Sequence, residues 1–209
     1  MVKERPAEEE DRELREILSL GRQIKDKQEN LFKALAILYR EGMIDDPIIR
    51  HHRLQRERDT QEETASYRKR LEGYRARTRD LRKQKVLDGL LERITFGERN
   101  YQREKHLLKL KGELDHLQKK REEYRFTISG MRGTTAALAA EEALQETAGR
   151  LSGKQAEHDA LFREHHCDQL ESEIRLNKLL LGTRSPAEDA RLLQQIRQAE
   201  LELRKLKET

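Results

Sequence analysis

The distribution of proline restricts this chain more than any other feature of its sequence. The three prolines are Pro6, Pro47 and Pro186, so residues 48–185 contain none. Proline breaks helices because it lacks a backbone N–H and its ring clashes with the preceding turn. A sequence without proline over this length can form long helices, and no alternating strand pattern competes with them. We therefore predict an all-α fold with about five helical segments.

The composition indicates that these helices pack without a thick core. Only 34% of the 209 residues are hydrophobic, whereas globular domains contain roughly 45–50%. Charged residues make up 40%, of both signs, and leave a net charge of +4. Intrinsic disorder usually requires a high net charge or many prolines, and neither is found here. We expect an elongated coiled coil or helical hairpin with a solvated surface of mixed charge.

Three stretches carry a heptad seam, meaning apolar residues at alternating steps of three and four that form one helix face. In the first stretch Gly21 and Gln28 are the weak members of the seam, and Gly42, followed by Asp46-Pro47, marks the end of one helix and the start of the next. The predicted seam residues are Leu14, Ile17, Ile24, Leu31, Leu35, Leu38, Leu107, Leu110, Leu114, Leu117, Leu192, Ile196, Leu203 and Leu206.

These patterns divide the chain into three segments. Residues 1–45 are expected to form an N-terminal helix, 46–130 a long basic coiled-coil helix or a hairpin, and 131–209 several shorter helices. Within the middle segment Gly97 is the candidate for a bend or a tight reversal. Residues 55–66 contain no large apolar side chain, so we expect a solvated helix or a hinge there.

Further breaks are expected in the last segment. SGMRGTT at 129–135 is typical of a loop, and Gly149 and Gly153 are expected to interrupt the helix before a new one at about 154–181. Gly182 is expected to end that helix. The sequence SPAE then gives a capping box, in which Ser185 and Glu188 bond to each other's backbone N–H groups.

Residues 67–85 form the strongest charge feature, which we call the basic segment. Two acids and nine basic residues give it a net charge of +7. We predict that its cations bind a polyanionic or acidic partner, and the alternative is that they are simply a solvated helix face. The nine basic residues are Arg68, Lys69, Arg70, Arg75, Arg77, Arg79, Arg82, Lys83 and Lys85.

Several kinds of partner fit a basic segment. An acidic protein surface such as a cytoskeletal filament is favoured, and nucleic acid is a second option without sequence specificity, because no recognition motif is found. Tyr67 and Tyr74 lie seven residues apart, which fits a seam better than a platform for stacked bases. A membrane surface is less favoured, because residues 1–20 are acidic and the chain has no tryptophan.

The residue pattern does not indicate an enzyme. The sequence contains no Gly-rich phosphate loop and no HExxH motif, and narrow seams do not build a pocket that excludes water. Potential metal ligands gather at His158, His165, His166, Cys167 and Asp168, but their spacing matches no standard zinc site. We therefore expect these residues to be structural, and we predict no catalytic residue, no metal and no cofactor.

The functional hypothesis is a non-enzymatic coiled-coil scaffold subunit that assembles with itself or with other helical proteins. The alternatives are a nucleic-acid-associated coiled-coil protein and a membrane-remodelling helical polymer. The sequence starts without an apolar signal-peptide core, no stretch approaches about 20 apolar residues, and the one cysteine allows no intrachain disulfide. We therefore expect a cytoplasmic location, with the nucleus as the alternative.

Overall fold

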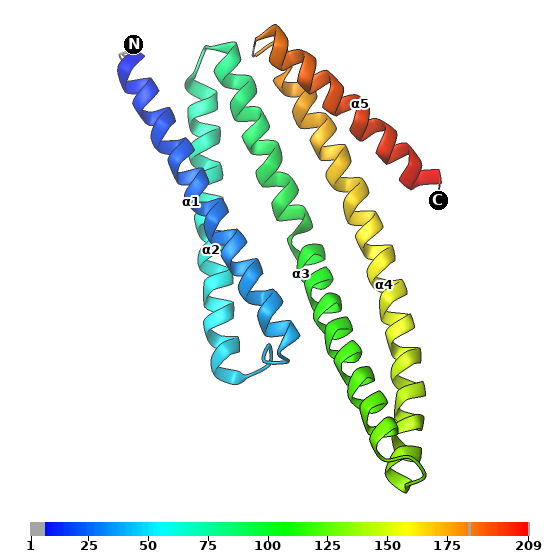
Figure 1. Ribbon diagram of the computed structural model, residues 1–209. Coiled ribbons are helices and arrows are strands. Elements are labelled where there is room, and N and C mark those ends of the chain that lie inside the picture. Colours follow the sequence, from blue (N-terminus) through cyan, green and yellow to red (C-terminus); the bar gives the residue numbers. More distant parts are fainter. Residues whose placement is uncertain (1–6, 184, 209) are drawn as a thin grey trace. The chain divides into compact units, whose positions relative to one another are not determined.

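A computed structural model describes residues 7–183 and 185–208, and it confirms the all-α prediction. Within these residues no strand is found, and none of the helices combines the length and apolar content needed to cross a bilayer. The helices are α1 (Ala7–Arg40), α2 (Pro47–Arg77), α3 (Leu81–Gly130), α4 (Thr135–Leu180) and α5 (Pro186–Glu208) (Figure 1).

Local sequence signals set several helix ends as predicted. Gly42 and Gly182, which follow α1 and α4, have φ angles of 68° and 76°, a left-handed backbone that glycine adopts without strain. The Asp46 carboxylate accepts hydrogen bonds from two backbone N–H groups in the first turn of α2. Before α5, the Ser185 N–H donates to the Glu188 carboxylate at 3.1 Å and the Glu188 N–H donates to the Ser185 hydroxyl at 3.4 Å.

The reversal in the middle of the chain is not at Gly97. Gly97 lies inside α3, and α2 and α3 are instead separated by residues 78–80. Asp80 starts α3 because its carboxylate accepts hydrogen bonds from the N–H groups of Arg82 and Lys83. The amide of Gln84 also donates to the Thr78 carbonyl at 2.7 Å. These contacts stabilise the turn, whereas one glycine in a helix costs only about 1 kcal/mol.

The interruption expected at Gly149 and Gly153 is also wrong. Both glycines lie inside α4, which is helical from Thr135 to Leu180. The Ala-rich start of α4 favours helix strongly, and Ala137 and Ala140 are buried there. The two glycines are therefore tolerated within a long helix, and each is exposed.

The chain forms two compact units, each built from distant parts of the sequence. The first unit comprises Met1–Leu31, His52–Asn100 and His166–Thr209, and the second comprises Phe32–His51 and Tyr101–His165. Each unit takes residues from all three predicted segments, so those segments describe the order along the chain rather than the grouping in space.

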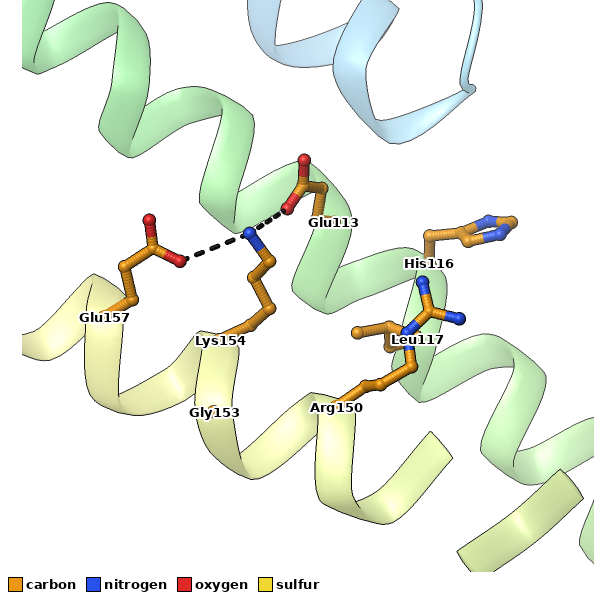
Figure 2. Close-up of a pocket in the computed structure, with 7 residues that line it drawn as sticks. All are labelled: Glu113, His116, Leu117, Arg150, Gly153, Lys154 and Glu157. Atoms are coloured by element: carbon orange, nitrogen blue, oxygen red, sulfur yellow. Dashed lines mark hydrogen bonds and ion pairs between the residues drawn. The ribbon is translucent and has the colours of Figure 1, made fainter. Parts of the chain in front are cut away.

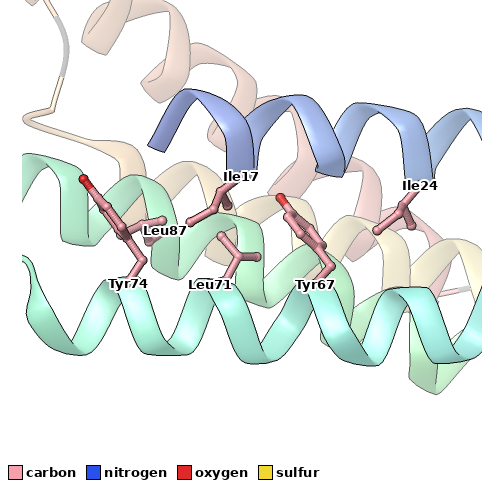
Figure 3. Close-up of a cluster of buried hydrophobic side chains, with 6 residues drawn as sticks. All are labelled: Ile17, Ile24, Tyr67, Leu71, Tyr74 and Leu87. Atoms are coloured by element: carbon pink, nitrogen blue, oxygen red, sulfur yellow. The ribbon is translucent and has the colours of Figure 1, made fainter. Parts of the chain in front are cut away.

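The core of the first unit lies where α1, α2 and α3 pack together. Leu71 and Leu87 are completely buried, and Tyr74 is 2% exposed. Figure 3 shows these side chains pointing into one cluster, together with those of α1. The cluster consists of Ile17, Ile24, Tyr67, Leu71, Tyr74 and Leu87. Two smaller clusters join α4 to α5. Their buried residues are Leu170, Ile174, Leu176, Leu180, Leu192, Ile196 and Ala199.

The apolar gap at residues 55–66 is neither a hinge nor fully solvated. It is part of α2, and Glu57 and Thr64 are buried within it. The Glu57 carboxylate contacts Arg53 at 3.3 Å, and the Thr64 hydroxyl accepts a hydrogen bond from Gln28 of α1 at 3.1 Å. Positions 57, 60, 64, 67, 71 and 74 keep steps of three and four. The seam of α2 therefore continues through polar residues, which an apolar pattern does not detect.

The predicted seam residues are all buried or half-buried. Leu14, Leu38, Leu203 and Leu206 are half-buried and the other ten are buried. In the first unit, those on α1 pack on α2 and α3, and those on α5 pack on α4. These seams are covered by helices of the same chain.

Gly112 allows a close approach of two helices in the second unit. A Cβ atom at this position of α3 would lie 2.7 Å from the Cβ of Tyr39 and 2.8 Å from its carbonyl carbon, both on α1. Backbone atoms cannot move aside as a flexible side chain can. Glycine is therefore required here by packing, although it weakens the helix itself.

We predict that Gly112→Ala lowers the free energy of unfolding by about 1–3 kcal/mol, because the added methyl group overpacks the contact between α1 and α3. The matched control is Gly149→Ala, since a Cβ at Gly149 meets nothing within 4 Å. This control should raise the free energy of unfolding by up to about 1 kcal/mol through helix propensity alone. Urea unfolding of the three proteins measures both effects, and equal shifts for the two variants would contradict the close approach.

Candidate interaction surface

The basic segment is not one continuous helix surface. It covers the end of α2, the turn at residues 78–80 and the start of α3, all within the first unit. Its nine cations therefore lie on two helices and the turn between them. Some of them contact carboxylates or carbonyls of neighbouring helices in the same unit, and four exposed ones make no ion pair with the described residues.

Three arginines of α2 connect it to its neighbours. Arg75 makes a two-point contact with Asp88 of α3, at 2.8 and 3.2 Å. Arg68 contacts Glu98 of α3 at 2.5 Å, and Arg77 contacts Glu13 of α1 at 2.6 Å. The hydrogen bond and the charge of Asp88 raise the pKa of Arg75 further above its ordinary value. These three arginines therefore connect helices through ion pairs, and we call them the arginine ties.

Two lysines at the start of α3 differ from the arginines. Lys85 donates to the carbonyl of Leu181 at 3.0 Å, and this carbonyl lies just after the last residue of α4. A cation is favoured there, because the last carbonyls of a helix carry a partial negative charge. Lys83 is half-buried.

Four exposed cations of the basic segment differ from the others because they are not tied to a neighbouring helix. They are Lys69 and Arg70 on α2, Arg79 in the turn and Arg82 at the start of α3. None of them forms an ion pair with the residues that the structure describes. Their positive charges are thus available to a partner, and the neighbouring arginine ties hold the helices that carry them.

Tyr67 and Tyr74 do not belong to this surface. Their side chains are 5% and 2% exposed and lie in the core of the first unit (Figure 3). Burial raises the pKa of Tyr67. A Cβ atom at position 21 of α1 would overlap the Tyr67 hydroxyl group. Gly21 therefore leaves room for the Tyr67 ring. The two rings cannot stack on the bases of a nucleic acid.

The potential metal ligands of α4 are used in separate contacts. In the second unit, His165 lies 3.7 Å from Glu104, and His158 stacks on Phe162 and contacts Asp159 at 3.2 Å. In the first unit, His166 lies 2.9 Å from Glu202 of α5. Across the described residues, no three His, Cys, Asp or Glu side chains are arranged to hold a metal ion.

A groove of about 460 Å³ lies between α3 and α4 of the second unit. Figure 2 shows Lys154 pointing between two carboxylates, with Glu113 at 3.0 Å and Glu157 at 3.2 Å. Hydrogen bonds to both carboxylates raise the pKa of Lys154. The amine therefore stays protonated, so it serves as an ion-pair bridge and is unsuited to act as a nucleophile or a base.

A second groove of about 540 Å³ in the same unit is mainly apolar. Its lining includes Phe32 of α1, Leu107 and Leu114 of α3, and Phe162 of α4. Glu104 also lines this groove, and burial raises the pKa of its carboxyl group. Removal from water disfavours the charged form of a carboxylic acid.

Comparisons with protein-family models, with curated proteins and with solved structures give no match for this chain.

Sequence reasoning found the basic segment but could not tell which of its arginines are paired with carboxylates of other helices. That division depends on Glu13, Asp88 and Glu98, which lie outside the segment and are brought to it by packing. Spacing along α2 gives no signal for these partners. A charge-reversal experiment on Arg75 would therefore disturb the contact between α2 and α3 together with any binding.

The raised pKa of Glu104 leads to a pH-dependent prediction. Because its pKa is higher in the folded chain, its contribution to stability is fully present below the pKa of the unfolded chain and is lost as the pH rises through the folded value. We expect Glu104→Gln to raise the midpoint of urea unfolding at about pH 7 and to leave it nearly unchanged at about pH 4. Glu142→Gln, an exposed change on α4, is the control. A gain of the same size at both pH values would contradict the assignment to burial.

Proposed function

We propose that this chain is a non-enzymatic helical scaffold subunit whose first unit contacts an acidic protein surface, such as a cytoskeletal filament. The observation that carries the proposal is the division of the basic segment. Lys69, Arg70, Arg79 and Arg82 are exposed, whereas their neighbours Arg68, Arg75 and Arg77 are held by carboxylates. The exposed cations are therefore placed on helices that are already fixed to one another.

A restrained backbone favours binding, because fewer groups must be ordered when the partner binds. Arg75 ties α2 to α3 on one side of the turn and Arg77 ties α2 to α1. The backbone that carries the exposed cations is thereby restrained, although their own side chains stay free to adjust. Complementary charge of this kind mainly increases the rate of association and the choice of partner.

An acidic protein fits this surface better than a nucleic acid does. Carboxylates lie among the cations, since Glu72 and Asp80 belong to the basic segment. A phosphate backbone carries only negative charge, whereas a protein surface that is acidic overall can also place a cation opposite these carboxylates. The burial of Tyr67 and Tyr74 also removes the aromatic contacts that single-stranded nucleic acids use.

Assembly with a helical protein is supported by exposed leucines in the first unit. Leu193 and Leu201 on α5 are 45% and 58% exposed. Around α5, Leu193 lies about 100° and Leu201 about 180° from Leu192, so both lie away from the face that Leu192, Ile196 and Ala199 present to α4. Apolar side chains on an exposed helix face gain from contact with a further helix.

The proposal is tested by reversing the four exposed cations to glutamate. This change lowers the net charge from +4 to −4 and leaves the arginine ties intact. We expect unchanged helix content by circular dichroism, and co-sedimentation with microtubules or actin filaments weakened by roughly tenfold or more, because attraction between the charges is replaced by repulsion. The variant is Lys69→Glu, Arg70→Glu, Arg79→Glu and Arg82→Glu.

The matched control reverses four exposed arginines outside the basic segment and produces the same change in net charge. Binding that falls equally in both variants would show a response to net charge alone and would contradict the proposal. Tighter binding of the parent chain to duplex DNA, with a slope of log affinity against log salt near −0.9 per phosphate contact, would favour the nucleic-acid alternative. The control is Arg50→Glu, Arg191→Glu, Arg197→Glu and Arg204→Glu.

A further inference from the structure

The turn between α3 and α4 carries a group of exposed apolar side chains in the second unit. We call residues 124–138 the hairpin tip. Phe126 near the end of α3 is 80% exposed, Met131 in the turn is 52% exposed, and Leu138 at the start of α4 is 62% exposed. Exposed large apolar residues gathered at one place indicate an interaction site rather than ordinary surface.

These side chains do not continue the contact between α3 and α4. On α4 the buried positions are Ala137 and Ala140, and Leu138 lies beside them on the exposed side. On α3 the apolar residues Tyr124 and Ile128 are half-buried, and Phe126 lies between them in sequence, about 200° around the helix from each. The tip therefore presents apolar groups that the hairpin itself does not use.

The charge of the hairpin tip is positive. Between Glu123 and Glu141 the sequence contains Arg125 and Arg132 and no acidic residue. Both arginines are exposed, and Arg125 also contacts Glu122 at 3.2 Å. Over residues 119–138 five cationic and two acidic residues leave a net charge of +3. Exposed apolar side chains are thus combined with a local excess of positive charge.

We infer that the hairpin tip binds the surface of an anionic lipid membrane. Phe126, Met131 and Leu138 would enter the boundary between headgroups and acyl chains, and Arg125 and Arg132 would contact lipid phosphates. Shallow insertion of apolar groups and attraction between basic residues and anionic lipids act together in such binding. This inference goes beyond the proposed function, because the two concern different surfaces. The hairpin tip lies in the second unit, and the exposed cations of the basic segment lie in the first.

The charge argues against a second copy of the chain as the occupant. A symmetric contact between two hairpin tips would place the same surface on both sides. Arg125 and Arg132 would then face their own counterparts across an apolar contact. A membrane with anionic lipids provides both an apolar layer and the opposite charge, so it satisfies both features of the tip.

The absence of tryptophan from the chain allows a direct test. In the full-length variant Phe126→Trp, the single tryptophan reports the surroundings of the tip. We expect its fluorescence to shift to shorter wavelength with vesicles of phosphatidylcholine and phosphatidylserine, and brominated lipids to quench it. Vesicles of phosphatidylcholine alone should bind more weakly, because the arginines lose their electrostatic attraction.

The control is Phe162→Trp, which replaces another exposed aromatic residue of the second unit, on α4 about 36 Å along the helix from Leu138. Its emission should not shift with vesicles. Adding Arg125→Glu and Arg132→Glu to Phe126→Trp should weaken vesicle binding by roughly tenfold or more. In the otherwise unchanged chain, Phe126→Ser with Met131→Ser should reduce co-sedimentation with the same vesicles.

Three results would overturn the inference. The first is an unchanged emission of Phe126→Trp when anionic vesicles are added. The second is an equal shift for Phe162→Trp, which would show contact through the side of the hairpin. The third is a shift that appears without lipid and grows with protein concentration, which would indicate a contact between copies. Circular dichroism of each variant verifies that the helices are retained.

Discussion

The helices of this chain carry few apolar residues and must therefore pack in close contact. The rest of the structure depends on this constraint. Each helix has only a narrow apolar stripe. It therefore buries apolar surface efficiently only where its backbone or a large aromatic ring lies close to the neighbouring helix. Gly112 meets the backbone of α1 in the second unit, and Gly21 makes room for the Tyr67 ring in the first. These glycines weaken their own helices and gain packing between helices instead.

Much of the helical layout could be predicted from local sequence. Gly42, Asp46, Gly182 and the Ser185–Glu188 pair act within a few residues, so their effect is visible in the sequence. The reversal at residues 78–80 was missed because it contains neither glycine nor proline. The polar part of the α2 seam was missed because Glu57 and Thr64 are polar residues that are nevertheless buried, and Thr64 bonds to Gln28 of α1, which only the fold brings near.

The two candidate surfaces could also be predicted only in part. Their charges are visible in the sequence, whereas their contacts and exposure depend on the fold. The sequence located the basic segment, but the engagement of Arg68, Arg75 and Arg77 depends on carboxylates from α1 and α3. The hairpin tip could have been suspected from its lack of acidic residues. Its apolar side chains stand out only once their exposure is known, because the sequence alone does not distinguish Leu138 from the leucines that are buried in the seams.

The polar contact between α1 and α2 also determines how these two helices are aligned. Heptad stripes repeat every seven residues, so an apolar seam alone would allow one helix to slide along the other to an equivalent position. Gln28 donates to Thr64 in the observed arrangement, and a shift of one heptad would place its amide opposite Leu71 or Glu57. Opposite Leu71 the amide would lose its partner in a buried position, which is costly. Gln28, the weakest member of its stripe by hydrophobicity, thus disfavours the shifted register in which it would face Leu71.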